Sequence, residues 1–156
     1  TAAKELLEEI NDFEIIIAPV GGGGLLSGTS ISAKSMKPDI TVIAAEPKGA
    51  DDAFRSFQSG KLIPSVNPQT ICDGLLTSLS DLTFSIIQKH VDEIITVSEK
   101  SIIEAMYLIW SRMKIIIEPS SAVTLAAIIE NKSKFCGKKT GIIISGGNTE
   151  LNQLPF

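Results

Sequence analysis

The fold is decided by the stretch Phe13-Glu14-Ile15-Ile16-Ile17-Ala18-Pro19-Val20, which is followed at once by Gly21-Gly22-Gly23-Gly24. Its isoleucine-rich centre is typical of a strand that is buried on both faces of a sheet. The glycines end this strand, and the apolar spacing over residues 25–36 predicts a helix directly after them. A buried strand, a loop and a helix in this order are the first part of a parallel α/β unit.

The rest of the chain alternates between helical and strand-like segments in the same way. A helical period over residues 1–10 predicts a first helix with Thr1 as its N-cap. The remaining strands are predicted over residues 40–45, 93–97 and 140–145, and the remaining helices over residues 53–59, 80–90, 98–113 and 120–129. The sequence therefore predicts an open α/β sheet that is mostly parallel, with binding loops after the carboxyl ends of the strands.

Composition excludes several classes of function. The 156 residues are 44% hydrophobic and carry a net charge of −4, and their basic residues are scattered. This pattern argues against nucleic-acid binding and against a polybasic membrane surface, and no apolar run is long enough to span a membrane. One histidine, His90, argues against a histidine-rich zinc site or a catalytic triad. Cys72 and Cys136 follow no pattern and indicate free thiols in a reducing, cytoplasmic compartment.

The glycine loop at residues 21–24 predicts a binding site for a phosphate group. Because glycine has no Cβ, the backbone N–H groups of this loop can all turn toward one point. The start of the next helix adds partial positive charge there. The loop lacks the lysine of a P-loop, because Thr29 follows Gly28, and it lacks the third glycine of the dinucleotide fingerprint. A ligand with a single phosphate is favoured. A nicotinamide cofactor remains an alternative, because sites for such cofactors have an acidic residue about 20 residues after the glycines and Glu46 lies at that spacing.

Two further loops carry polar groups next to predicted strands. Ser145 ends the last strand before Gly146-Gly147-Asn148, where its hydroxyl could bond a ring nitrogen or simply form the turn. The segment Glu46-Pro47-Lys48-Gly49-Ala50-Asp51-Asp52 follows the second strand. The carboxylates of Glu46 and Asp52 with the carbonyl of Ala50 could hold Mg²⁺ or Ca²⁺ together with waters, or the segment could be a solvated turn.

Five segments together resemble the fold-type II pyridoxal-phosphate (PLP) enzymes of the serine racemase/threonine dehydratase family. They are PVGGGGLLSG, AAEPKGADD, CDGL, IIEPSSA and IISGGN, and they span almost the whole chain. The resemblance implies a three-layer, twisted sheet like that of the tryptophan synthase β subunit, with this chain as the C-terminal part of the large domain. The cofactor residues that it implies are Gly21, Gly22, Gly23, Gly24 and Leu25 at the phosphate, Ser145 at the pyridine nitrogen, and Gly74 and Glu118 near the ring.

The resemblance also implies other ligands and partners. A divalent cation would bind at Glu46, Ala50 and Asp52, as in the serine racemase-like branch. A nucleotide would bind at a subunit interface near Lys114 and Asn148, and the parent enzyme would be a homodimer acting on a small amino acid.

The lysine that forms a Schiff base with PLP has no counterpart here. In the family it lies in an S-x-K-x-R-G-A segment far upstream of the glycine loop, and none of the lysines of this chain has that context. No catalytic residue is therefore assigned, and we expect an N-terminal portion to be missing and residues 1–156 to be inactive alone. The parent would racemise or dehydrate serine, threonine or 3-hydroxyaspartate. The alternatives are a non-catalytic PLP-binding or interaction fragment and, more remotely, an NAD-dependent oxidoreductase.

Overall fold

A computed structural model describes residues 2–156 apart from the side chain of Gln153, so the predicted N-cap Thr1 lies outside the described residues. The sheet consists of β1 (Ile15–Pro19), β2 (Thr41–Pro47), β3 (Glu93–Val97) and β4 (Thr140–Ile142). The α-helices are α1 (Ala2–Glu9), α2 (Gly24–Met36), α3 (Asp52–Ser59), α4 (Asp81–His90), α5 (Glu99–Leu108), α6 (Pro119–Glu130) and α7 (Lys132–Phe135). Short turns of helix are η1 (Lys48–Ala50), η2 (Asp73–Leu75), the π-helical η3 (Ile109–Met113) and η4 (Leu151–Gln153).

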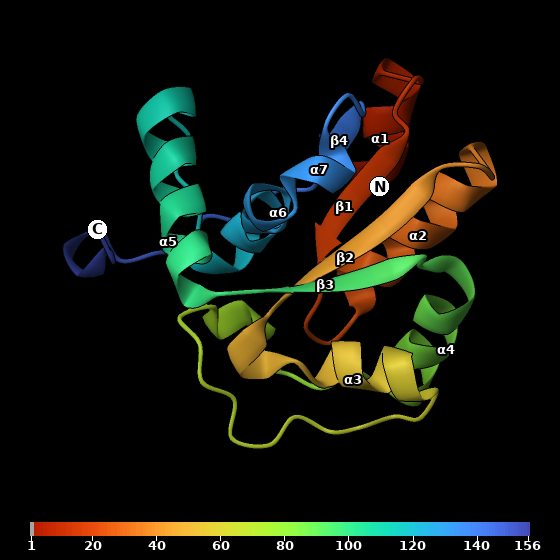
Figure 1. Ribbon diagram of the computed structural model, residues 1–156, viewed down its shortest axis with the longest axis horizontal. Coiled ribbons are helices and arrows are strands. Elements are labelled where there is room, and N and C mark those ends of the chain that lie inside the picture. Colours follow the sequence, from red (N-terminus) through yellow and green to blue (C-terminus); the bar gives the residue numbers. More distant parts are fainter. Residues whose placement is uncertain (1) are drawn as a thin grey trace.

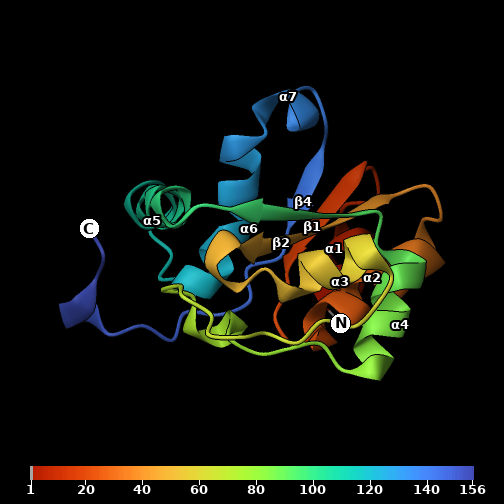
Figure 2. The same cartoon turned by 60° about the horizontal axis from the view of Figure 1, so that its bottom comes forward.

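The four strands run parallel in the order β3-β2-β1-β4, as Figure 1 shows. Successive side chains of a strand point to opposite faces, and both faces of β1 are covered. Ile15 and Ile17 belong to a core cluster with α5 and α6, whereas Ile16 and Ala18 belong to one with α1, α2 and α4. Figure 2 shows the sheet between these two helical layers. The predicted three-layer, parallel α/β fold is confirmed.

Three segment boundaries differ from the sequence prediction. β2 continues through Glu46 and Pro47, because these residues still pair with β3. The helix after Ser98 changes to the π-helical η3 and ends at Lys114, which has a left-handed backbone with φ of 60°. β4 ends at Ile142, where the chain begins to leave β1 for the start of α6; the N–H of Ile143 still donates to the carbonyl of Ile17.

The carboxyl ends of β1, β2 and β4 lie at the same edge of the sheet, because the strands are parallel. A bridging segment, residues 69–75, runs along this edge. The N–H of Gln69 donates to the carbonyl of Gly49 at 2.7 Å, and the N–H of Ile71 donates to Glu99 Oε2 at 3.0 Å. The bridging segment therefore contacts the loop after β2 and continues into η2.

The remaining connection to this edge is the segment between η3 and α6. The indole Nε1 of Trp110 donates to the carbonyl of Ile117 at 2.9 Å and fixes this segment just before Glu118, the N-cap residue of α6. None of the helices in residues 2–156 has the length and apolar composition of a membrane span.

Candidate functional site

A cavity of about 240 Å³ opens at the carboxyl edge of the sheet. It gathers residues from the loop after β1, from η2, from the start of α6 and from the loop after β4. The residues that line it are Pro19, Gly21, Gly22, Gly23, Gly24, Leu25, Gly74, Leu75, Glu118, Ser120 and Ser145. The structure thus brings all eight predicted cofactor residues, which are spread over 125 positions (21–145) of the sequence, to one cavity.

The glycine loop forms the end of the cavity next to α2. Gly23 has a left-handed backbone with φ of 82°, and a Cβ atom there would lie 2.7 Å from Leu79 Cδ2, so only glycine fits. Gly24 begins α2 and has no atom within 4 Å of the position of a Cβ. The N–H groups of Gly21, Gly22 and Gly23 have no hydrogen-bond acceptor among residues 2–156. The loop therefore presents free donors beside the positive end of a helix, which suits an anion.

Ser145 lies in the same cavity and is held from behind by α6. Its Oγ lies 3.0 Å from the Oγ of Ser121, which in turn is 2.7 Å from both the N and the O of Gly146. The N–H of Glu118 also donates to the carbonyl of Gly146, at 3.1 Å. These bonds fix the loop after β4 against the start of α6 and fix the position of the Ser145 hydroxyl.

Gly74 lies between the two ends of the cavity. Its N–H donates to the Oγ of Ser120 at 3.1 Å and to Asp73 Oδ1 at 2.9 Å. A Cβ atom on Gly74 would lie 3.0 Å from the Ser120 Oγ. Gly74 is therefore packed tightly against the start of α6, while its predicted position next to the cofactor ring stays a prediction.

The sequence reasoning missed four residues of this site. Pro19, Leu75 and Ser120 line the cavity, and Ser121 supports Ser145 from behind. The signal for the two serines was available, because Ser120 and Ser121 directly follow the Glu118-Pro119 pair that starts a helix.

The cavity lining carries little charge. Glu118 is the one ionisable residue among the described residues that line it, and none of them is lysine, arginine or histidine. The cavity can bind a phosphate through backbone dipoles, and Glu118 is the one ionisable group of the described lining, which offers no lysine for a Schiff base.

The three residues predicted to bind a cation lie between the end of β2 and the start of α3. Glu46 is 1% exposed, and its Oε1 and Oε2 accept the N–H groups of Ala53 at 3.0 Å and Phe54 at 2.9 Å. Burial raises the pKa of Glu46 to about 8. Asp52 is also 1% exposed, and neither of its carboxylate oxygens has a hydrogen-bond partner at normal distance and angle in the part of the chain that the structure describes. Burial raises the pKa of Asp52 as well, and the N–H of Asp52 and the Ser65 hydroxyl are near enough only to oppose this effect of burial on the pKa.

These residues fit a cation only as a mixed set of donors. No group of three or more His, Cys, Asp or Glu side chains in residues 2–156 is arranged to hold a metal ion. Two carboxylates, the buried Ala50 in η1 and waters would have to share the coordination, as Ca²⁺ and Mg²⁺ allow. The unpartnered carboxylate of Asp52 is the observation that fits such an ion.

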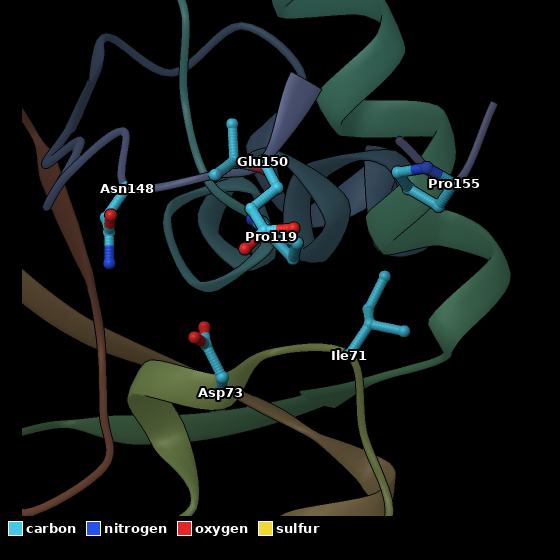
Figure 3. Close-up of a pocket in the computed structure, with 7 residues that line it drawn as sticks. Ile71, Asp73, Pro119, Asn148, Glu150 and Pro155 are labelled. Carbon is cyan, nitrogen blue, oxygen red and sulfur yellow. The ribbon is translucent and has the colours of Figure 1, made fainter. Parts of the chain in front are cut away.

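The two residues predicted to bind a nucleotide do not share a pocket. Asn148 lines a second cavity, of about 390 Å³, together with Ile71, Asp73, Pro119, Thr149, Glu150 and Pro155. Figure 3 shows Asp73 and Ile71 on the bridging segment, across this cavity from Pro119. Lys114 is exposed at the end of η3 and is not among the lining residues. The nucleotide site stays a prediction, since it was placed between subunits.

The chain is similar to known proteins over nearly its whole length. It is 48% identical over 156 residues to the β-hydroxyaspartate dehydratase of Paracoccus denitrificans, covering 100% of this chain and 50% of that protein. It is 56% identical to the serine racemase of Dictyostelium discoideum, covering 99% of this chain and 49% of that protein. The chain therefore spans about half the length of the curated relatives it matches.

Solved structures agree with these relatives. The crystal structure of serine racemase from Dictyostelium discoideum superposes with a TM-score of 0.90 at 57% identity, over 96% of this chain and 48% of that one. The structure of maize serine racemase superposes with a TM-score of 0.91 at 40% identity, over 96% of this chain and 47% of that one. The family model "Pyridoxal-phosphate dependent enzyme" matches residues 1–146. The chain belongs to this family of pyridoxal-phosphate dependent enzymes.

Proposed function

We propose that this chain supplies the phosphate and ring-nitrogen contacts for PLP in an enzyme that racemises or dehydrates small hydroxy amino acids. The observation that carries the proposal is the cavity itself, with free backbone donors at Gly21–Gly23 and the hydroxyl of Ser145 in one lining. The names of the relatives, serine racemase and hydroxyaspartate dehydratase, support serine or 3-hydroxyaspartate as the substrate, and that of a similar solved structure, a threonine deaminase, supports threonine.

The residues of the chain divide the work of binding. The N–H groups of the glycine loop would hold the phosphate with the help of the α2 dipole. Ser145 would orient the ring through its nitrogen, and Gly74 and Glu118 would lie along the ring. When bound, PLP supplies an electron sink for negative charge at the substrate's α carbon. A neutral hydroxyl as the nitrogen's partner favours an unprotonated ring, which suits elimination and racemisation rather than transamination.

We infer that the group forming the Schiff base lies outside residues 1–156. Because no lysine lines the cavity within the described residues, the Schiff-base lysine would come from an N-terminal portion, which is the partner we propose. The residues that contact the substrate would lie mainly there too. We further propose that the parent enzyme is a cytoplasmic homodimer; the free thiols of Cys72 and Cys136 support a reducing compartment.

The test of the phosphate cradle is Gly22→Asp in the full natural polypeptide that carries this chain. A Cβ atom on Gly22 would lie 3.4 Å from Thr77 Oγ1, so the new side chain crowds the glycine loop and places a negative charge beside the phosphate donors. We expect PLP affinity to fall by about 100-fold or more. Equilibrium dialysis followed by cofactor absorbance measures this. Gly28→Ala in α2 is the matched control, because no atom lies within 4 Å of its Cβ position. Unchanged PLP binding in Gly22→Asp would refute the proposal.

One observation favours a second candidate, a PLP-binding fragment without turnover, namely the absence of lysine from the described lining of the cavity. The two candidates differ in the products formed from L-serine. The full natural polypeptide should release D-serine, or pyruvate and ammonia, if it is the enzyme. Cofactor binding with neither product would support the non-catalytic candidate.

We also propose that Mg²⁺ or Ca²⁺ binds at Glu46, Asp52 and the carbonyl of Ala50. The ion would neutralise two buried carboxylates, one of which has no hydrogen-bond partner in the described part of the chain. Calorimetric titration with each ion should show binding to the wild type and at least about a tenfold loss in Asp52→Asn. Asp51→Asn is the matched control, because the Asp51 carboxylate is paired with Arg55 at 2.8 Å. Equal affinity of the wild type and Asp52→Asn for the ion would refute the proposed cation site.

A further inference from the structure

Ser121 is a buried serine in the IIEPSSA segment, where the resemblance assigns it no role, and the proposed cofactor contacts do not use it. It lies in the first turn of α6 and is fully buried, with 0% of its surface exposed. Its Oγ has three neighbours within hydrogen-bond distance: Gly146 N at 2.7 Å, Gly146 O at 2.7 Å and Ser145 Oγ at 3.0 Å. The Ser121 hydroxyl has one proton, so it can donate to only one of its neighbours at a time.

The directions of two of these bonds follow from the chemistry of the groups. An amide N–H only donates, so Gly146 N–H occupies one lone pair of the Ser121 oxygen. A carbonyl only accepts, so the contact to Gly146 O requires the Ser121 proton. The third contact joins two hydroxyls, and either can donate.

Two arrangements of protons satisfy the cluster. In the first, Ser121 donates to Gly146 O, so Ser145 must donate to Ser121 and offers only lone pairs to the cavity. In the second, Ser121 donates to Ser145, and the Ser145 proton is free to point into the cavity. Gly146 O keeps a partner in both cases, because the N–H of Glu118 donates to it at 3.1 Å. The second arrangement therefore leaves this carbonyl with one partner, but no proton then lies between Ser121 Oγ and Gly146 O, so these two oxygens must move apart from their present 2.7 Å.

We propose that Ser121 is a positioning residue that sets whether Ser145 acts as donor or acceptor toward a ligand's ring nitrogen. This inference rests on the proposed function, in which that nitrogen meets Ser145. An unprotonated ring nitrogen is an acceptor and selects the second arrangement, in which Ser121 holds the Ser145 oxygen and directs its proton into the cavity. A cavity without such a ligand can revert to the first arrangement.

The test compares two ligands that differ only at the ring nitrogen. The first probe is pyridoxine 5′-phosphate, which needs no lysine to bind, and the second is its analogue with C–H in place of the ring nitrogen. Calorimetry on the full natural polypeptide should show that Ser121→Ala lowers the affinity for pyridoxine 5′-phosphate by about 3- to 10-fold, which corresponds to the loss of one net hydrogen bond. The same variant should bind the carbon analogue and inorganic phosphate with unchanged affinity.

A double-mutant cycle separates positioning from a structural role. In the Ser145→Ala background, Ser121→Ala should have no further effect on pyridoxine 5′-phosphate, because the hydroxyl that it positions is gone. The control variant is Ser30→Ala, a buried serine of α2 whose Oγ donates to the carbonyl of Ser27. It should bind all probes like the wild type.

Each other outcome overturns the inference in a recognisable way. An equal loss for both ring ligands would mean that Ser121 only supports the loop after β4. No loss for either would mean that Ser145 needs no partner. If the wild type bound phosphate but neither ring ligand, the proposed PLP site would fail, and the role of Ser121 would fail with it.

Discussion

The loop after β1 and the loop after β2 leave the same edge of the sheet on neighbouring strands, yet they have opposite polarity. Pro19, the last residue of β1, pairs with Ala45, one residue before Glu46. The first loop has no charged side chain and presents free N–H donors. The second, residues 48–51, which we call the acidic loop, is flanked by two carboxylates out of contact with solvent, Glu46 in β2 and Asp52 at the start of α3. The same strand-end geometry is thus compatible with the anion site that we propose at the first loop and with the cation site that we propose at the second.

The two loops also differ in how much they destabilise the folded protein when no ligand is bound. Free N–H groups beside an open cavity can be hydrated, so the glycine loop carries no large penalty. The buried carboxylates of Glu46 and Asp52 are destabilised in their charged form, and burial raises the pKa of both. We therefore expect the acidic loop to limit the stability of the protein.

The largest expected effect is the loss of stability when a methyl group is added to Gly49 in the acidic loop, compared with the same change at Gly24 in the glycine loop. A Cβ atom on Gly49 would lie 1.8 Å from the carbonyl oxygen of Gln69, so Gly49→Ala must move backbone. We expect a loss of about 3 kcal/mol or more in the free energy of unfolding, measured with urea. Gly24→Ala, where the space is open, should change it by no more than about 1 kcal/mol, with a gain expected from helix propensity.

The same pair of variants can break the comparison. Equal losses of stability in Gly24→Ala and Gly49→Ala would show that the glycine loop is as tightly packed as the acidic loop. A stable Gly49→Ala variant would show that the bridging segment can leave the acidic loop at little cost.

A smaller effect should be visible at Cys72, in the bridging segment between the two loops. Burial raises the pKa of the Cys72 thiol to about 12, whereas Cys136 is exposed. Iodoacetamide at pH ~8 should alkylate Cys72 at least about tenfold more slowly than Cys136, as mass spectrometry of the modified peptides would show. Faster alkylation of Cys72 in Gly49→Ala than in Gly24→Ala would show that the bridging segment opens from the acidic side. Equal rates at both cysteines would contradict the burial of Cys72.

The sequence predicted those features that depend on local pattern. Apolar runs located β1 to β4, and glycine clusters located the loops that form the cavity. The resemblance then chose the eight residues that the structure brings together. Periodicity could not reveal η3, because its five residues form about one turn, too short a segment to establish a spacing different from that of α5.

Contacts between distant segments could not be predicted. Glu46 caps α3 through the N–H groups of Ala53 and Phe54, and this depends on how β2 meets α3. The contact between Ser121 and Ser145 joins residues that are 24 positions apart and exists only once β4 and α6 have packed. The Glu118-Pro119 pair indicates that Ser121 lies at the start of a helix, but it does not identify Ser145 as the partner of Ser121.

The bond between Trp110 and Ile117 has an optical consequence. Trp110 is the single tryptophan of the sequence, and its indole N–H is tied to the residue directly before Glu118 in the cavity wall. Indole fluorescence depends on the hydrogen bond and the polarity at Nε1. The emission of one residue therefore reports on the cavity without any label, and a titration cuvette is enough to follow its filling.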